Sequence, residues 1–377
     1  MRAIIIGGGI GGVTTAIALR RAGIEARVYE RAPEPREVGA GIALWGNAVR
    51  ALRSINAAEP VERAGERCII AEILTSQGRV LKRTPVEALD RIAGAPMLLV
   101  HRAELLAALL SSLPPDAVRF GAECVGVRQT PESVTARFRD DSTDTADLLV
   151  GADGINSVVR TGLFGPQRHR YSGYTCWRGI AEIPESLVPP GYVGEIWGLG
   201  ARFGITRIGR GRVYWWATAN TAEGGRDTDT HATLADRFHR WAPPVPAVID
   251  ATPRGHAIRN DIIDRAPSRP WGRGRLVLVG DAAHPTSPNL GQGGCMAIED
   301  GVLLPRALTR TRGVPEALRA FEHERFARCA MITNRSWTFG RWGQTERSAL
   351  AWMRNTTMAM IPESMTLRAA AAMLKFE

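Results

Sequence analysis

The sequence predicts an α/β fold built around a nucleotide-binding domain, and three stretches of the 377-residue chain carry this prediction. Each stretch joins an apolar run of strand length to a glycine-bearing turn and then to a helical pattern. They span residues 1–30, 147–160 and 276–308. A chain of this length exceeds one typical domain, so we expect two domains that share a large core.

The first stretch begins the chain with a short apolar strand over residues 1–6. Glycines follow it at once, at Gly7, Gly9, Gly11 and Gly12. In such a turn the first glycine permits a tight bend, the second lets a pyrophosphate approach the backbone, and a later one lets the helix pack against the strand. A second strand ends at Glu30, about 20 residues beyond the glycines, where a ribose-binding acid is expected. The combination predicts an adenine dinucleotide site.

The other two stretches repeat this arrangement later in the chain. A strand over 147–151 leads to Asp153 and Gly154, and a helix is predicted to begin near Ser157. A strand over 276–279 leads to Gly280 and Asp281, then to a glycine-rich loop over 288–294 and a helix. A carboxylate and bare amides at a helix N-terminus favour a polar, partly anionic ligand. Each stretch alone also fits an ordinary connection or helix cap, but together they indicate one ligand site.

In order and spacing, the three motifs resemble those of the class A flavoprotein monooxygenases, the p-hydroxybenzoate hydroxylase family. The resemblance covers nearly the whole chain. It implies an FAD-binding domain of the glutathione reductase type, with an inserted, mostly antiparallel β-sheet substrate domain and a helical C-terminal region. With the strand patterns, it places the FAD-binding domain and C-terminal helices at residues 1–70, 101–170 and 265–377. The substrate-binding sheet would then comprise residues 71–100 and 171–264.

The resemblance also implies which residues bind FAD. Glu30 would hold the adenosine ribose, and Asp281 the ribityl or pyrophosphate part. The loop over 288–294 and the helix behind it would stabilise negative charge on the reduced flavin. Gly41 and Arg102 also fit a plain loop glycine and a solvated helix-start charge. The expected cofactor-binding residues are Gly7, Gly9, Gly11, Gly12, Glu30, Arg31, Gly41, Arg102, Val125, Asp153, Gly154, Gly280, Asp281, Pro288, Gly291, Gln292, Gly293 and Gly294.

Residues 171–264 are rich in tryptophan and show alternating strand patterns, which predict an antiparallel sheet with one face able to wall an apolar pocket. Any single aromatic residue here also fits ordinary sheet packing. The stretch 171–179 is similar to flavin-dependent urate hydroxylases, and this likeness implies that Arg202 and Tyr214 bind the substrate. Those enzymes carry an aspartate where this chain has Asn289, and the loss of that general base argues against urate.

Salicylate and hydroxybenzoate hydroxylases often place a histidine in the pocket. In this chain His169, His231, His239 and His256 do not fall at the expected sheet positions. The resemblance implies a structural role for His284, which lies in the turn after Asp281.

The resemblance implies an enzyme that inserts one oxygen atom of O2 into an aromatic, heteroaromatic or polycyclic substrate by way of a flavin hydroperoxide. A second glycine fingerprint is missing, so NADH or NADPH would bind transiently to reduce the FAD. Three alternatives remain open. A nicotinamide dehydrogenase would account for residues 7–30 but not for the two later motifs. A flavoprotein oxidase or reductase of the same fold, or a non-catalytic FAD-binding protein, would account for all three motifs.

Composition and charge limit which binding partners and which compartment we expect for the protein. The net charge of +10 would favour nucleic acid or an anionic surface, but the arginines are scattered and no nucleic-acid-binding motif is present. The five cysteines show no metal-binding spacing and suit a reducing cytoplasm. No apolar run reaches membrane-spanning length, and the opening strand leaves no room for a signal peptide. We therefore expect a cytoplasmic monomer or homodimer without a metal.

Overall fold

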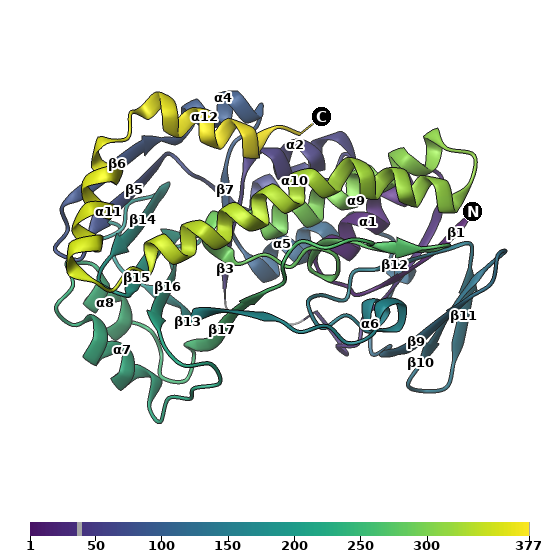
Figure 1. The fold of residues 1–377 in the computed structure, drawn as a ribbon, viewed down its shortest axis with the longest axis horizontal. Helices are drawn as coiled ribbons and strands as arrows, with labels where there is room; N and C mark the ends of the chain where they lie inside the picture. The colour runs from purple at the N-terminus through teal and green to yellow at the C-terminus, as the bar shows by residue number, and fades with distance from the viewer. Residues whose placement is uncertain (36–39, 377) are drawn as a thin grey trace.

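The computed structural model describes residues 1–35 and 40–376, and it shows two sheet regions bridged by a long helix (Figure 1). One region contains a sheet with strand order β18-β19-β12-β1-β2-β8. Its strands are β1 (Arg2–Ile6), β2 (Glu25–Tyr29), β8 (Val118–Arg119), β12 (Leu148–Gly151), β18 (Gly272–Arg273) and β19 (Leu276–Leu278).

Three parallel strands of this sheet end side by side. Ile6 of β1 pairs with Gly151 of β12, and Gly151 pairs with Leu278 of β19. Each of the three sequence motifs begins within two residues of one of these strand ends. Because parallel strands share one carboxyl edge, motifs far apart in the sequence meet at a single edge of the sheet. This arrangement confirms the predicted α/β class.

The second region is a mostly antiparallel sheet with strand order β17-β13-β16-β15-β14-β5-β6, in which only β14 and β5 run parallel among the described pairs. Helices α7 (Thr230–Phe238) and α8 (Val245–Asp250) accompany it. Its strands are β5 (Ile70–Thr75), β6 (Val80–Pro85), β13 (Arg170–Glu182), β14 (Tyr192–Trp197), β15 (Ala201–Arg207), β16 (Arg212–Asn220) and β17 (Ile258–Asp264).

Two small sheets complete the described strands. One is formed by β3 (Gly41–Leu44), β7 (Leu98–His101) and β4 (Glu66–Arg67), and the other by β11 (Thr143–Ala146), β10 (Val134–Phe138) and β9 (Cys124–Gln129). Because β7 pairs with β3 and β4, the end of the segment 71–100 lies outside the large antiparallel sheet. The predicted division into two domains stays a prediction.

The C-terminal region is helical, as predicted. Proline inside a helix usually kinks or ends it, but helix α9 (Gly293–Arg310) passes through Pro305 without ending. Packing against α1 (Ile10–Arg21), α2 (Gly46–Ser54) and α10 (Val314–Gly343) holds α9 together despite the hydrogen bond that proline removes. Helices α11 (Ser348–Met360) and α12 (Glu363–Leu374) follow α10.

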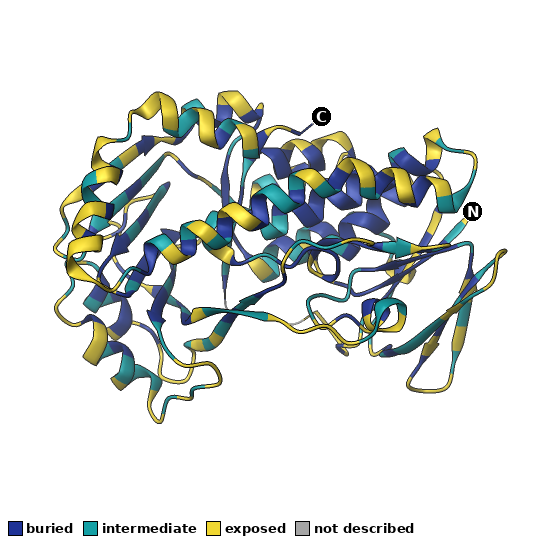
Figure 2. Cartoon of the chain, in the orientation of Figure 1, coloured by how far each residue is buried: buried dark blue, intermediate teal, exposed yellow. Residues whose placement is uncertain are grey.

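The remaining described helices precede α9 in the chain. Helices α1 and α9 are largely buried against each other (Figure 2), and both Gly11 and Gly280 face Ala297. No helix in residues 1–35 and 40–376 is long and apolar enough to cross a membrane. The other helices are α1 (Ile10–Arg21), α2 (Gly46–Ser54), α3 (Ala58–Ala64), α4 (Val86–Ala93), α5 (Arg102–Leu110), α6 (Val158–Phe164), and the short 3-10 helices 115–117, 280–282 and 288–290.

Candidate active site

The glycine turn after β1 is tightly packed between Gly7 and Gly12 and open at Gly9. Gly7 has a φ of +108°, and a Cβ atom on Gly12 would lie 1.9 Å from the carbonyl oxygen of Gly7. A Cβ on Gly9 would meet nothing within 4 Å. The helix therefore packs tightly against the strand while the backbone at Gly9 faces open space, which fits the close approach of a pyrophosphate. This cradle agrees with the predicted FAD site.

Glu30 is held firmly at the end of β2. One carboxylate oxygen accepts a hydrogen bond from the Gly8 amide at 2.7 Å, and the other accepts one from the Ala32 amide at 2.8 Å. Each oxygen retains a lone pair that can accept from a ribose hydroxyl. Arg31, the neighbouring expected contact, is exposed.

The Asp153 carboxylate caps helix α6. It accepts hydrogen bonds from the Ser157 hydroxyl at 2.5 Å and from the amides of Val158 at 2.7 Å and Val159 at 3.2 Å. Burial nevertheless raises the pKa of Asp153 above its ordinary value. Gly154, with a φ of +79°, faces open space. The structure therefore gives Asp153 a capping role and leaves the Gly154 backbone available to a ligand.

Arg160, which the sequence argument did not single out, ties the second motif to the third. Its side chain is 2% exposed. One guanidinium nitrogen donates to the Ala282 carbonyl at 3.1 Å, and another donates to the Ser268 hydroxyl at 3.0 Å. One feature of the sequence could have identified Arg160: it lies at the start of α6, three residues after the Ser157 cap. The contact fixes the two motif loops relative to each other.

The third motif exposes Asp281. Burial of its carboxyl group nevertheless raises its pKa above 3.8, while His284, Arg102 and Arg265 partly oppose that shift. A carboxylate in a recess can be both accessible and poorly hydrated. Asp281 can therefore contact a polar part of a ligand.

The loop before α9 leaves its amides uncovered at one end. Gly291 has a φ of +61°, and a Cβ on Gly293 would meet nothing within 4 Å. A Cβ on Gly294 would lie 2.8 Å from Ile42. Pro288 begins the short 288–290 helix, and the buried Gln292 side chain accepts from Asn47 at 3.1 Å. The open N-terminus of α9 therefore offers positive partial charge to a reduced flavin.

Three further residues were expected to contact the cofactor, namely Gly41, Arg102 and Val125. Gly41 lies against Tyr214, because its Cβ would come within 2.6 Å of that ring. Arg102 is exposed at the start of α5, and its amide donates to the Ala40 carbonyl at 2.9 Å. Val125 is the extra residue of a bulge in β9, which frees backbone groups as a backbone contact requires.

One face of the large antiparallel sheet turns toward Gly41. The register pairs Arg178 of β13 with Trp216 of β16, and Trp216 with Gly204 of β15. Tyr214 and Arg202 lie on the same face, because strand residues alternate between faces. A Cβ on Gly204 would lie 1.8 Å from the Trp216 ring, so the indole covers this glycine. We call this surface the site face.

Arg202 is an expected substrate ligand, but its guanidinium group already donates hydrogen bonds to other residues of the protein. Its side chain is 3% exposed, and it donates to Glu195 at 2.8 Å, to the Asn289 side-chain oxygen at 2.7 Å and to Gln344 at 3.0 Å. The Asn289 oxygen also accepts from the Tyr174 hydroxyl at 2.9 Å, while its amide group donates to the Ser336 carbonyl at 3.0 Å. A carboxylate could not make that last donation, so this network suits asparagine.

Tyr214, the other expected substrate ligand, is half-buried, and burial raises the pKa of its hydroxyl far above 10.0. It remains protonated at neutral pH and can donate a hydrogen bond. Its ring lies 5.6 Å from that of Trp216, centroid to centroid.

Arg178 also lies on the site face, although it was not among the predicted site residues. None of the described residues forms an ion pair with it. The Cys176 thiol, a neighbour on the same face, is the first cause that raises the pKa of Arg178, against the opposing effect of burial. The alternation of Tyr174, Cys176 and Arg178 along β13 was a signal that could have placed it. Within the part of the chain that the structure describes, Arg178 is thus a cation of the site face without a carboxylate partner.

Three comparisons agree with this geometry. Residues 1–336 match the family described as FAD binding domain. The chain is 42% identical to the aurachin C monooxygenase/isomerase of Stigmatella aurantiaca, over 95% of this chain and 94% of the relative. It is 33% identical to the 2-heptyl-3-hydroxy-4(1H)-quinolone synthase of Pseudomonas aeruginosa, over 97% and 95%. The structure of Klebsiella pneumoniae HpxO with FAD and uric acid matches with a TM-score of 0.94 at 30% identity, over 99% of this chain and 96% of that one.

Proposed function

We propose that this chain, which belongs to the FAD-binding family of class A flavoprotein monooxygenases and is an FAD-dependent monooxygenase, hydroxylates a 4-quinolone-type heteroaromatic substrate. The relative from Pseudomonas aeruginosa is named for a 3-hydroxylated quinolone that carries an apolar heptyl chain. The aurachin C relative, which is named a monooxygenase/isomerase, has the higher identity of the two. NADH or NADPH would reduce the flavin, and O2 would supply the oxygen atom.

The observation that carries the proposal is Arg178, which has no carboxylate partner among residues 1–35 and 40–376 and stands on the same sheet face as Tyr214 and Trp216. A ring keto group accepts hydrogen bonds, and a guanidinium that holds it would fix the orientation of the ring carbon beside it. Because that carbon gives electron density to the electrophilic oxygen, Arg178 would act by binding and positioning the substrate. The indole of Trp216 offers an apolar surface for a flat bicyclic ring.

Bound FAD supplies the reduced flavin that activates dioxygen, and the protein positions the substrate and excludes water. Arg178 would hold the keto oxygen, and the protonated Tyr214 hydroxyl would donate a second hydrogen bond to the substrate. Arg202 keeps Asn289, and with it the loop before α9, in place through its buried network. Glu195 forms an ion pair with Arg202, so its carboxylate is not free to act as a base. A substrate that is already electron-rich needs no such base.

We further propose that the enzyme works in a reducing cytoplasm as a monomer or homodimer. All five cysteines are free and buried.

The test measures NAD(P)H oxidation by the FAD-loaded enzyme with a 2-alkyl-4-quinolone, with urate and with salicylate, and records product mass under labelled dioxygen. We expect the quinolone to accelerate oxidation and to gain one labelled oxygen atom. Faster oxidation with a product that gains labelled oxygen from urate, but not from the quinolone, would contradict the proposal.

Replacement of Arg178 tests the anchor. Arg178→Met should raise KM about tenfold to a hundredfold, because a charge-assisted hydrogen bond of roughly 1.5–3 kcal/mol is lost. Arg178→Lys should recover part of this loss, and FAD affinity should not change. An unchanged KM would assign Arg178 a purely structural role.

A further inference from the structure

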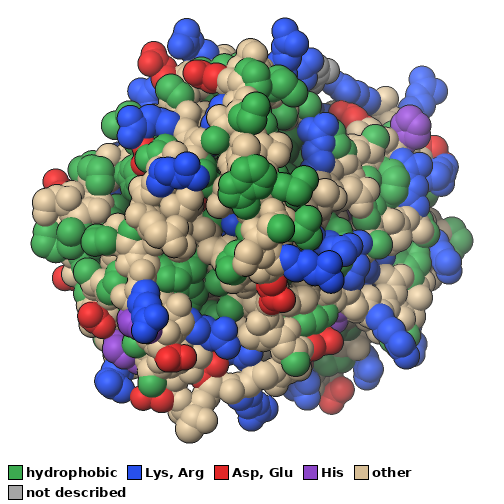
Figure 3. Space-filling view, turned by 60° about the vertical axis from the view of Figure 1, so that its left-hand side comes forward, with side chains coloured by type: hydrophobic (Ala, Val, Ile, Leu, Met, Phe, Trp, Pro, Cys, Tyr) green, Lys and Arg blue, Asp and Glu red, His purple; other side chains and the backbone are tan. Residues whose placement is uncertain are grey.

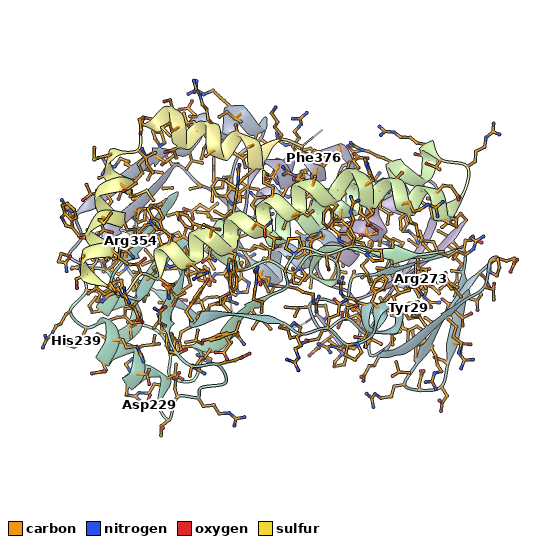
Figure 4. All side chains as sticks on the ribbon, in the orientation of Figure 1. Tyr29, Asp229, His239, Arg273, Arg354 and Phe376 are labelled. Carbon is orange, nitrogen blue, oxygen red and sulfur yellow. The ribbon has the colours of Figure 1, made fainter. Side chains whose placement is uncertain are left out.

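Helix α11 buries its charged residue and exposes most of its large apolar residues, although Ala351 and Met358 are buried. Trp352 is 69% exposed, Met353 56% and Met360 75%. Its sole charged residue, Arg354, is 2% exposed and turns back into the protein (Figure 4). Arg354 donates to the carbonyls of Gly343 at 2.7 Å and Gly198 at 3.0 Å. This polarity is the reverse of an ordinary surface helix.

The exposed apolar residues form one surface on α11 and the start of α12, which we call the C-terminal apolar face. It comprises Leu350, Trp352, Met353, Met360 and Met365, each at least 48% exposed. Residues 352, 353 and 360 recur at helical spacing on one side of α11. Apolar side chains gather on this side of the molecule, with arginines spaced among them (Figure 3). Apolar surface concentrated in this way marks an interaction site.

Basic residues border the C-terminal apolar face. Arg347 is exposed at the start of α11, and Arg368 is exposed on α12. Strand β6 packs against α11, and the hairpin before it presents exposed Arg79 beside Val80, which is 42% exposed. Exposed acids also lie near these helices, at Glu346, Glu363 and, on the α4 helix that packs against α12, Glu87. Glu346 already accepts from Asn220 at 2.7 Å. With a chain net charge of +10, this border favours an anionic partner.

The C-terminal apolar face adjoins the site face of the sheet. Gln344, between α10 and α11, accepts from Arg202 at 3.0 Å and from Thr218 at 3.1 Å. Gln344 and Arg341 also line an open surface pocket of about 510 Å³. One short connection therefore joins the exposed apolar helix to the substrate side of the protein.

We propose that the C-terminal apolar face binds the surface of an anionic lipid bilayer and thereby brings the substrate site to substrates dissolved in lipid. Trp, Met and Leu side chains would insert among the acyl chains while the arginines contact lipid phosphates. Helices α11 and α12 would lie on the bilayer, not across it. The benefit of such docking rests on the proposed function, because a quinolone with an apolar chain partitions into membranes. The lipid binding itself does not depend on the proposed function.

The test is co-sedimentation of the FAD-loaded enzyme with phosphatidylglycerol vesicles and with phosphatidylcholine vesicles, without substrate. We expect binding to phosphatidylglycerol that weakens with salt, and weaker binding to phosphatidylcholine. The double variant Trp352→Ser, Met353→Ser should bind at least roughly tenfold more weakly. Leu187→Ser, which removes a 39% exposed leucine from a loop elsewhere, is the matched control and should bind as the parent does.

Activity measurements distinguish a failure of the proposed lipid binding from a failure of the proposed function. With a water-soluble substrate, both variants should keep the parent rate, because neither residue set lies in the site. No sedimentation with phosphatidylglycerol, or equal sedimentation of the double variant, would overturn the inference. A dimer in analytical ultracentrifugation that the double substitution dissociates would also overturn it and assign this surface to a second copy of the chain.

Discussion

The two faces of the large antiparallel sheet carry the same local arrangement and use it differently. On each face a glycine stands opposite a tryptophan of β16: Gly179 opposite Trp215, and Gly204 opposite Trp216. Trp215 is fully buried among residues of α7 and α8, and its indole donates to Thr252 at 2.8 Å. Trp216 is half-buried on the site face. The pairing is set by strand register, but the covering elements decide whether the ring is core or pocket wall.

The largest expected effect separates these two rings. Trp215→Ala should lower the free energy of unfolding by about 3–5 kcal/mol, because it leaves a large cavity in a packed core. Trp216→Ala should lower it by about 1–2 kcal/mol, since less surface is buried, and should raise KM for substrate. Urea denaturation of the FAD-loaded variants checks this. Equal losses of unfolding free energy from the two substitutions would contradict the distinction between a core ring and a pocket-wall ring.

The next effect concerns the two arginines of the site face. Arg202→Met should destabilise the protein by about 2–4 kcal/mol, because Glu195 loses the partner of a buried ion pair. Arg178→Met removes no such partner and should leave stability within about 1 kcal/mol. The same denaturation measurement applies. A similar loss from both would show that Arg178 is also a structural cation.

The two glycines provide a smaller test. Gly179→Ala should cost about 1–3 kcal/mol, because its Cβ would lie 2.6 Å from a Trp215 ring that the core holds in place. Gly204→Ala meets the Trp216 ring even more closely, but that ring can turn toward the open side. We expect about 1 kcal/mol of destabilisation and a clear change in KM. Thermal unfolding and steady-state kinetics distinguish the two outcomes.

The smallest expected effect on stability comes from the buried pair His284 and Asp300 beside the third motif. Burial alone would lower the pKa of His284, but Cys329 and Asp300 outweigh it, so its pKa lies well above 6.5. The pKa of Asp300 is lowered: burial opposes this, but His284 and Arg325 prevail. The histidine's contribution is therefore complete below about pH 6.5 and declines as pH rises through the folded pKa, while that of Asp300 declines as pH falls below about 4.

His284→Gln should accordingly cost about 1.5 kcal/mol between roughly pH 4 and 6.5, and less at higher pH. Denaturation midpoints at several pH values, with Asn334→Gln on the exposed side of α10 as control, check this dependence. A cost that grows with pH would contradict the raised pKa.

Local patterns in the sequence determined the FAD side. The glycines at 7, 9 and 12, the acid at Glu30 and the turn at Gly280 act through backbone geometry within a few residues, and the shared edge of parallel strands brings them together. The family resemblance followed from these motifs and is confirmed by the comparisons. The continuous α9 and the added α12 could not be predicted, because packing against distant helices overrides local propensity there.

Only the tertiary structure decided what each site-face residue does. Arg202 finds its partners at Glu195, Asn289 and Gln344, and Arg178 finds no carboxylate among the described residues, although both arginines occupy similar strand positions. Strand alternation gives the face of a side chain but not the residues that arrive there from other parts of the chain. Those contacts join segments up to 142 residues apart, and no pattern of spacing specifies them.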